Sequence, residues 1–272
     1  MDSRTVAGGG GVDIRVDAYG PADARPVLML HGYSQCRLAW RGQYRSSLAD
    51  DYRLLCVDLR GHGASDKPRD AYDDPALWAA DIEAVLDAFG AEDAAVVAWS
   101  YAGLVALDYL AERGTDRVAG VDFVGAVSSI GSPEATARLG EEYVGLMGDL
   151  TATDAEASMA GVEGLVRVCR AGEPSPEELY LEMGYTAAVP PHVRDALRSR
   201  TVDREDTLAG LEVPVLFTHG SEDAVVLPET EAHHADLLPT AERSVYEGVG
   251  HSPFAEAPDR FNDELRAFLD SL

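Results

Sequence analysis

Lysine is almost missing from this 272-residue chain, in which Lys67 is the only one. The 22 basic side chains stand against 48 aspartates and glutamates, so the formal net charge is −26 and the pI is near 4.4. Nucleic-acid binding needs clustered Lys and Arg, which excludes nucleic acid as a partner. The acid excess is typical of a salt-adapted surface, because salt screens charge within about 3 Å at 1 M. Drift in an arginine-rich, GC-rich genome is the alternative, but it explains only the loss of lysine.

Cysteine is scarce as well. Cys36, Cys56 and Cys169 form an odd set without a C-x-x-C spacing, which predicts neither a disulfide framework nor a zinc site. Cys56 lies inside an expected strand and Cys169 in an expected helix, so neither occupies a turn suited to a nucleophile. We therefore expect three reduced thiols, and no bound metal or cofactor.

Long apolar runs are absent. No segment approaches the about 20 residues needed to span a bilayer. Residues 1–11 also lack the basic start and apolar stretch of a secretory signal. These absences predict a soluble, cytoplasmic protein with no membrane partner. Hydrophobic residues make up 46% of the chain, enough for one large domain with a full core and an inserted subdomain.

Ser100 lies where an apolar strand over residues 94–99 gives way to a helix. Small residues surround it, namely Ala98, Ala102 and Gly103. Hydrolases mount a nucleophilic serine at such a junction, because the turn lifts the hydroxyl clear of the sheet toward a base. The usual pattern is G-x-S-x-G, from which this chain departs at both glycines. An ordinary serine N-cap of the helix is the alternative.

A carboxylate and a histidine follow two later strands. Asp223 lies on the loop beyond the strand at residues 213–219, and His251 follows the strand at residues 244–246. Catalytic groups of open α/β sheets gather beyond the carboxyl ends of strands. A histidine can take and return the serine proton while a carboxylate fixes its tautomer. Glu222 is the rival acid, and a solvated turn aspartate and a structural loop histidine are the alternatives.

Two backbone amides are candidates for an oxyanion hole. An early apolar strand ends at His31-Gly32, which leaves the Tyr33 amide as one donor, and the Tyr101 amide directly after the serine is the other. A plain turn after the strand is the alternative at His31-Gly32. The other histidines are less suited to be the base. We expect surface positions for His233 and His234 and a packed strand end for His219. His62 lies in a Gly-rich loop and His192 follows two prolines, so neither follows the final strand.

The segment 131–208 interrupts the alternation of strands and helices. Four helical pieces are expected there, because cap residues or prolines mark first turns at 132–133, 151–154, 175–176 and 190–191. Strand signals are missing from this segment. We predict an α/β fold with a mostly parallel twisted sheet and helices on both faces. Residues 1–130 and 209–272 form its catalytic core, and residues 131–208 form an inserted helical cap.

A cap over the carboxyl edge of the sheet excludes water and supplies a pocket wall. Trp99 and Phe254 flank candidate catalytic residues, so we predict that both line this pocket. The candidates from the cap itself are Tyr143, Met147, Tyr180 and Met183. Packing of the cap helices on each other is the alternative for these four.

Taken together, these segments resemble the α/β-hydrolase superfamily over nearly the whole chain, with the closest likeness to esterases, lactonases and non-haem chloroperoxidases. The resemblance implies that Ser100 is the nucleophile, Asp223 the acid and His251 the base, in the family's chain order. It also implies that Tyr33 and Tyr101 are the oxyanion donors.

The same resemblance narrows the chemistry. Residues 58–65 are similar to the family's D-x-R-G-x-G-x-S loop, which we interpret as architectural. Haloalkane dehalogenases and epoxide hydrolases of this fold use an aspartate nucleophile, whereas position 100 is serine, which favours acyl transfer. Perhydrolases typically carry a proline directly after the oxyanion aromatic residue. This chain has Ser34 there, which disfavours efficient peracid formation.

We therefore predict a serine hydrolase that cleaves small-molecule carboxylic esters through an acyl-enzyme intermediate. One alternative is cleavage of lactones or activated carbon–carbon bonds by the same three residues. The other is a hydrolase-fold ligand receptor with little turnover.

Overall fold

The computed structural model describes residues 1–272 and contains one large eight-stranded sheet. Its order is β1-β2-β4-β3-β5-β6-β9-β10. Neighbouring strands from β4 to β10 are parallel, whereas β1 and β2 add antiparallel pairs at one edge. The predicted mostly parallel sheet is confirmed. The strands are β1 Asp2–Ala7, β2 Asp13–Tyr19, β3 Pro26–Leu30, β4 Arg53–Val57, β5 Ala94–Trp99, β6 Val118–Val124, β9 Val215–Gly220 and β10 Glu242–Tyr246.

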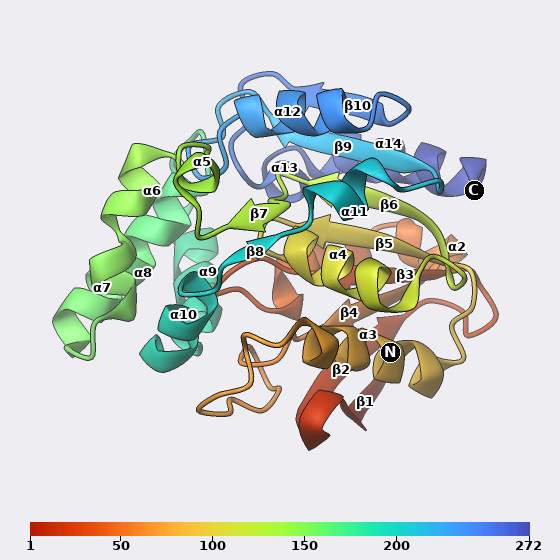
Figure 1. The fold of residues 1–272 in the computed structure, drawn as a ribbon, viewed down its shortest axis with the longest axis horizontal. Coiled ribbons are helices and arrows are strands. Elements are labelled where there is room, and N and C mark those ends of the chain that lie inside the picture. Colours follow the sequence, from red (N-terminus) through yellow and green to blue (C-terminus); the bar gives the residue numbers. More distant parts are fainter.

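Helices cover both faces of this sheet (Figure 1). One face packs against α3, α4 and α12, and the other packs against α1, α2, α13 and α14. The bounds are α1 Arg41–Tyr44, α2 Leu48–Asp51, α3 Pro75–Phe89, α4 Ala102–Arg113, α12 Glu229–Leu237, α13 Pro253–Glu256 and α14 Pro258–Ser271.

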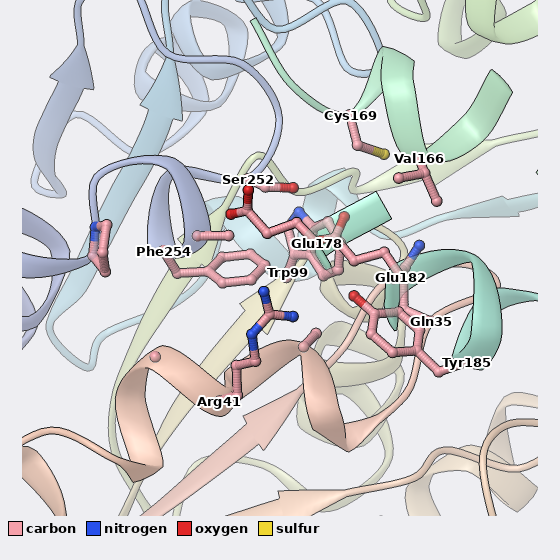
Figure 2. Close-up of a pocket in the computed structure, with 14 residues that line it drawn as sticks. Gln35, Arg41, Trp99, Val166, Cys169, Glu178, Glu182, Tyr185, Ser252 and Phe254 are labelled. Carbon is pink, nitrogen blue, oxygen red and sulfur yellow. The ribbon is translucent and has the colours of Figure 1, made fainter. Parts of the chain in front are cut away.

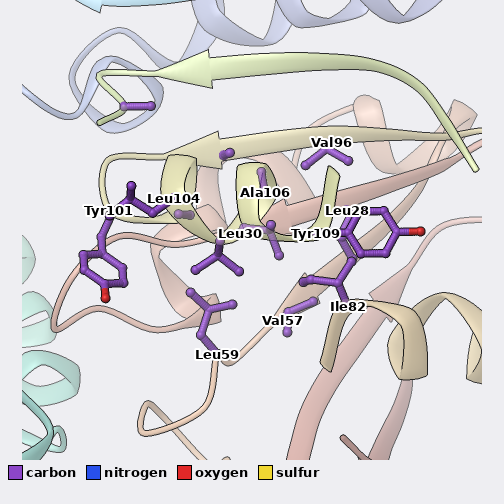
Figure 3. Packing of buried hydrophobic residues seen from close by; sticks show 14 of the residues in the cluster. Leu28, Leu30, Val57, Leu59, Ile82, Val96, Tyr101, Leu104, Ala106 and Tyr109 are labelled. Atoms are coloured by element: carbon purple, nitrogen blue, oxygen red, sulfur yellow. The ribbon is translucent and has the colours of Figure 1, made fainter. Parts of the chain in front are cut away.

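Strand side chains alternate between two hydrophobic cores. In β3, Leu28 and Leu30 join the core under α3 and α4, whereas Val27 and Met29 join the core under α14. Successive side chains of a strand point to opposite faces, so a strand buried on both faces needs an unbroken apolar run. Figure 3 shows the first core, where Leu104 of α4 packs near Leu30.

The chain between β6 and β9 forms further helices (Figure 1). The short strands β7 (Ser129–Ile130) and β8 (Val202–Asp203) pair antiparallel near the two ends of this helical segment. The helices are α5 Pro133–Thr136, α6 Glu141–Gly145, α7 Met147–Thr151, α8 Ala155–Val168, α9 Pro176–Ala187, α10 Pro191–Arg198 and α11 Glu205–Ala209. Of these, α5 to α10 stand beside the sheet, whereas α11 lies close to α4 and α12. The four expected helix starts correspond to α5, α8, α9 and α10.

The helical segment departs from the sequence expectation in two respects. It contains more than four helical pieces, because α6, α7 and α11 are short helices without a side-chain N-cap bond to mark their starts. It also contains the strand β8, whose two residues are too few to leave a pattern.

Two further differences lie in the core domain. The strand β1 was not expected, because its side chains are almost all exposed and show no alternation. The prediction of a surface position for His234 is wrong: its Nε2 lies 2.8 Å from Ser128 Oγ, and its ring packs against Phe217 inside the protein.

The structure also bears on the cysteines, on metal-binding clusters and on membrane-spanning helices. The three cysteines are free and buried. No cluster of His, Cys, Asp and Glu side chains is arranged to hold a metal ion. No helix combines the length and apolar character that crossing a bilayer requires.

Candidate active site

Four parallel strands of the sheet deliver the candidate residues to one of its edges. Ser100 follows β5, Asp223 follows β9 and His251 follows β10, while Tyr33 follows β3. Because these strands are parallel, their carboxyl ends meet at the same edge. Residues far apart in the sequence therefore surround one small space.

Ser100 occupies a strained turn. Its backbone has φ +57°, in the left-handed region that side chains other than glycine rarely adopt. The Ser100 N–H donates to Val124 O at 2.9 Å, and its carbonyl accepts from the Gly103 and Val127 amides. The helix α4 begins at Ala102 and has no side-chain N-cap bond. Ser100 is thus not an ordinary helix N-cap, and its side chain is left free to face the sheet edge.

Asp223 orients His251. The His251 Nδ1 lies 2.7 Å from Asp223 Oδ2, while Asp223 Oδ1 accepts from the amides of Val225 and Val226 at 2.8 and 2.9 Å. Both residues are 2% exposed. The rival Glu222 is exposed and points elsewhere. A bond at Nδ1 leaves the His251 Nε2 as the nitrogen available to a second group.

A second histidine shares the same carboxylate oxygen. His219 Nε2 lies 3.2 Å from Asp223 Oδ2 and 2.8 Å from Val226 O. Burial alone would raise the pKa of Asp223, but the adjacent His251 and His219 hold that pKa well below its usual value. Burial opposes protonation of His219, but the hydrogen bond to Asp223, the charge of Asp223 and the Val226 carbonyl together outweigh burial and raise the pKa of His219. Asp223 is therefore a carboxylate that stays ionised near neutral pH.

Gly125 makes room for this pair. It follows β6 with φ +48°, and a Cβ there would lie 3.1 Å from His251 Nδ1 and 3.2 Å from Asp223 Oδ2. The sequence analysis did not single out Gly125. A glycine at the end of a strand beside the nucleophile strand was the available signal.

Ser100 and His251 line the same small cavity, which we call the catalytic cavity. No hydrogen bond joins the Ser100 hydroxyl to His251 in this structure. Hydrogen bonds between nucleophile and base are often long or poorly aligned before substrate binds. The cavity encloses about 10 Å³, which is room for about one water molecule.

The expected oxyanion donors lie beside the serine. Neither the Tyr33 amide nor the Tyr101 amide donates a hydrogen bond to another protein group. A Cβ at Gly32 would lie 3.0 Å from Ser100 Cβ, so the glycine lets this loop approach the serine closely. Two unpaired amides near a candidate nucleophile are the arrangement that an oxyanion requires.

A larger cavity, the outer cavity, opens next to the catalytic cavity and encloses about 220 Å³. The two share Gln35, Trp99 and Cys169 as walls. Figure 2 shows Arg41 reaching toward Trp99 and Phe254. The outer cavity therefore mixes aromatic and charged walls.

The helix α9 contributes acidic side chains to the outer cavity. Glu178, Glu182 and Tyr185 recur at the spacing of one helix face and line this cavity. Glu182 lies 2.5 Å from Arg170, and Glu178 lies 3.3 Å from it. The sequence analysis did not predict that this face of α9 lines a cavity, because glutamates in a helix are usually solvent-exposed.

A third cavity of about 280 Å³, the apolar cavity, adjoins the catalytic cavity through Tyr33 and Tyr143. Nine of its 12 lining residues are hydrophobic. Met147 of α7 and Leu139 are among them. Tyr143 of α6 stands between the apolar cavity and the catalytic one.

The pocket expectations divide accordingly. Trp99 and Phe254 line the outer cavity, and Tyr143 and Met147 line the apolar cavity. Met183 lines none of the three cavities, and Tyr180 is 75% exposed. Both residues lie on other faces of α9 than the one that Glu178, Glu182 and Tyr185 present to the outer cavity.

The chain matches the family model described as "alpha/beta hydrolase fold" over residues 25–258. It is 30% identical over 276 residues to a non-heme chloroperoxidase of Streptomyces lividans, with 98% of this chain and 99% of the relative covered. It is 27% identical over 271 residues to a bifunctional esterase/perhydrolase of Acinetobacter calcoaceticus, covering 96% and 97% of the two chains.

A solved structure is similar over the whole chain. The crystal structure of an esterase from Rhodococcus sp. ECU1013 superposes with a TM-score of 0.95 at 38% identity and covers 100% of both chains. The fold and the matched length agree across these comparisons. The chain belongs to the α/β-hydrolase fold family.

Proposed function

We propose that this protein is a serine hydrolase that cleaves small-molecule carboxylic esters through an acyl-enzyme intermediate. The observation that carries the proposal is the conjunction of three groups around the catalytic cavity. A serine in a strained turn and a histidine face the same cavity, and the histidine's far nitrogen is held by a buried carboxylate. That set matches the division of labour between nucleophile, base and orienting acid.

The proposed reaction proceeds in two halves. His251 Nε2 takes the Ser100 proton as Oγ bonds to the ester carbonyl carbon, and the Tyr33 and Tyr101 amides receive the oxyanion. The carbon–oxygen bond to the alcohol then breaks, and the proton on His251 passes to the leaving oxygen. Water repeats the sequence on the acyl-serine and releases the acid. Asp223 stays ionised throughout and stabilises the imidazolium.

The walls of the cavities favour a small substrate with one polar end and one apolar end. The catalytic cavity is too small for an ester group as it stands, so we propose that Tyr143 and Leu165 shift when substrate enters. The outer cavity offers charged and aromatic walls, and the apolar cavity offers hydrophobic ones. One side of the scissile bond would then be polar and the other apolar.

The helices between β6 and β9 fit the role of a cap. Leu165 and Cys169 of the α8 region and Tyr143 of α6 form walls of the catalytic cavity. Covering the site from these helices excludes water and supplies part of the walls that a substrate would meet. We propose that residues 131–208 act as this cap and that residues 1–130 and 209–272 form the catalytic core.

The test is a panel of p-nitrophenyl esters, lactones and vinylogous diketones assayed with the unchanged protein and with Ser100→Ala. We expect turnover of esters by the unchanged protein and none above background by the variant. A melting curve of the Ser100→Ala protein close to that of the unchanged one controls for folding.

The other outcomes discriminate the alternatives. Lactone turnover exceeding ester turnover assigns the same chemistry to cyclic esters, and turnover of the diketone alone assigns carbon–carbon cleavage. Tight binding of panel members without multiple turnovers favours a receptor. Ester turnover that survives Ser100→Ala would refute the proposed nucleophile.

A further inference from the structure

Arg194 of α10 is a buried cation without a carboxylate partner. It is 1% exposed, and all its side-chain hydrogen bonds go to neutral oxygens. The other fully buried arginines differ: Arg60 pairs with Asp81 and Arg200 pairs with Asp108. An unpaired buried charge is costly, and a guanidinium keeps its proton near neutral pH. Packing alone does not explain why a charged Arg194 is buried at this position.

The Arg194 guanidinium connects the loop after β3 to three helices of the cap. Its Nε donates to Ser34 Oγ at 2.9 Å, and its Nη2 donates to Thr186 O of α9 at 2.8 Å. Its Nη1 donates to Leu150 O of α7 at 2.9 Å and to Ser158 Oγ of α8 at 3.3 Å. One side chain thus holds Ser34 in a fixed position relative to the cap.

Ser34 needs such support. Its backbone has φ +60°, which is unfavourable for serine and persists only where the surroundings impose it. Its amide donates to His62 Nε2 at 3.3 Å, and its side chain meets Arg194. Tyr33, the residue directly before it, carries the proposed oxyanion amide and also donates its hydroxyl to Arg194 O at 3.2 Å. The orientation of the peptide on either side of Tyr33 therefore depends on these anchors.

We infer that Arg194 is a positioning residue of the proposed hydrolase, which acts through Ser34 to aim the Tyr33 amide and adds uncompensated positive charge near the oxyanion. The inference rests on the proposed function and deepens it. The strength of an oxyanion contact depends on the donor's aim, and a buried charge acts strongly where the local dielectric is low.

The inference predicts an effect on kcat more than on KM. Negative charge develops on the carbonyl oxygen only in the transition state, so a weakened oxyanion contact slows the chemical step. Ground-state binding depends on the cavity walls, which Arg194 does not line. A purely structural role would lower stability without changing kcat of the folded protein.

Ser34→Ala and Ser158→Ala form a matched pair for the first experiment. Each removes one hydroxyl that accepts from Arg194, the first in the loop and the second in the cap. We expect Ser34→Ala to lower kcat about 10-fold with KM within about twofold, a fraction of the loss of a whole oxyanion donor. Ser158→Ala should leave kcat within about twofold. Equal effects of the two variants would overturn the inference.

Arg194→Met and Arg194→Lys supply the second experiment. We expect Arg194→Met to lower kcat about 100-fold, and Arg194→Lys to recover part of the loss because it keeps the charge. Affinity for phenylboronic acid, which forms a tetrahedral adduct with an active serine, should weaken with kcat. The double variant with Ser34→Ala should show less than the product of the single effects, because the two residues act together.

Thermal melting of each variant separates stability from catalysis. Arg194→Met could lower the melting temperature while kcat and boronate affinity of the folded protein stay unchanged. That result would make Arg194 a purely structural residue. It would overturn this inference but not the proposed function. Failure of the unchanged protein to turn over any ester overturns the proposed function first, and this inference with it. If Arg194→Met does not fold, the Ser34→Ala and Ser158→Ala comparison still decides.

Discussion

At the residue scale, Asp223 is a buried carboxylate with close partners on both oxygens. Two backbone amides bind Oδ1, and two imidazoles, from His251 and His219, approach Oδ2. This crowding of donors depresses the pKa of the carboxyl below its usual value despite burial. The group is therefore suited to hold a histidine in one tautomer and to balance a transient imidazolium.

Asp223→Asn tests that role. The amide has nearly the same shape but presents an N–H where His251 Nδ1 now has an acceptor, which favours the wrong tautomer. If the proposed roles hold, we expect kcat to fall by roughly 10⁴, the loss known for the same change in a Ser-His-Asp protease. Steady-state kinetics on the best ester of the panel measure it. Glu222→Gln, a neutral change at the adjacent exposed position, should change kcat less than twofold, and a comparable loss there would contradict the assignment.

Asp122 is a carboxyl group buried in the sheet. It lies in β6, is 1% exposed, and accepts a hydrogen bond from Thr218 Oγ1 at 2.9 Å, while its Oδ2 has no partner. Burial raises the pKa of Asp122 to about 7. The folded state therefore binds a proton more tightly than the unfolded state, in which the usual value is 3.8. Its contribution to stability is full below pH 4 and is lost as the pH rises toward 7.

Asp122→Asn should remove this pH dependence, because the amide does not ionise and can still accept from Thr218. Between pH 4.5 and 7.5 we expect the variant's unfolding free energy to decline less than that of the unchanged protein, by roughly 1–4 kcal/mol. Urea denaturation at several pH values provides the measurement. Asp259→Asn, at an exposed site, is the control. Parallel pH curves for the unchanged protein and Asp122→Asn would contradict the account.

At the scale of elements, the turn between β5 and α4 depends on close packing behind the serine. A Cβ at Gly103 would lie 2.6 Å from Val127 O and 2.8 Å from Ala126 Cβ. Both of those atoms belong to the segment after β6, so the start of α4 lies directly against it. The absence of a side chain at Gly103 sets how deeply α4 sits, and hence where Ser100 is presented.

Gly103→Val should force α4 away from this segment. We expect a loss of about 1–3 kcal/mol in unfolding free energy from overpacking, together with lower kcat because Ser100 moves with the helix. Gly184→Ala in α9 is the control, since no atom lies within 4 Å of its Cβ. That change should stabilise by about 0.5–1 kcal/mol and leave kcat unchanged. Equal stability of the two variants would show that a side chain at position 103 is accommodated, which would contradict the close packing of α4 against the segment after β6.

At the scale of the whole molecule, the surface carries far more negative than positive charge. The formal net charge is −26, and arginine supplies all but one of the basic side chains. Some acids are paired, but exposed ones such as Glu112, Glu212 and Glu247 form no ion pair. Repulsion among such groups is released on unfolding and is screened by salt.

Stability should therefore rise with salt. We expect the urea midpoint to increase between 0.05 and 1 M NaCl, because the screening length falls from more than 10 Å to about 3 Å. Changing Glu112, Glu212 and Glu247 together to Gln should raise the midpoint at low salt and flatten its salt dependence. A midpoint that is independent of salt in the unchanged protein would argue against a salt-adapted surface.

The sequence by itself determined the strand-end placement of the candidate catalytic residues. Strands, small-residue turns and cap residues are local patterns, so Ser100, Asp223 and His251 were located from a few neighbours each, and parallel strands bring their ends together. The polar strand β1 and the one-turn helices α6 and α7 were not predicted from the sequence. They are stabilised by pairing and packing rather than marked by a local pattern.

Only the tertiary structure decided which side chains support those residues. Ser34 and Arg194 are 160 positions apart in the chain, and His219 reads as an ordinary packed residue until Asp223 is seen beside it. The tertiary structure also places Met183 outside the walls of the three cavities. A side chain's partner across the fold depends on helix rotation and depth to within about an ångström, and such distances arise from packing, which no local pattern encodes.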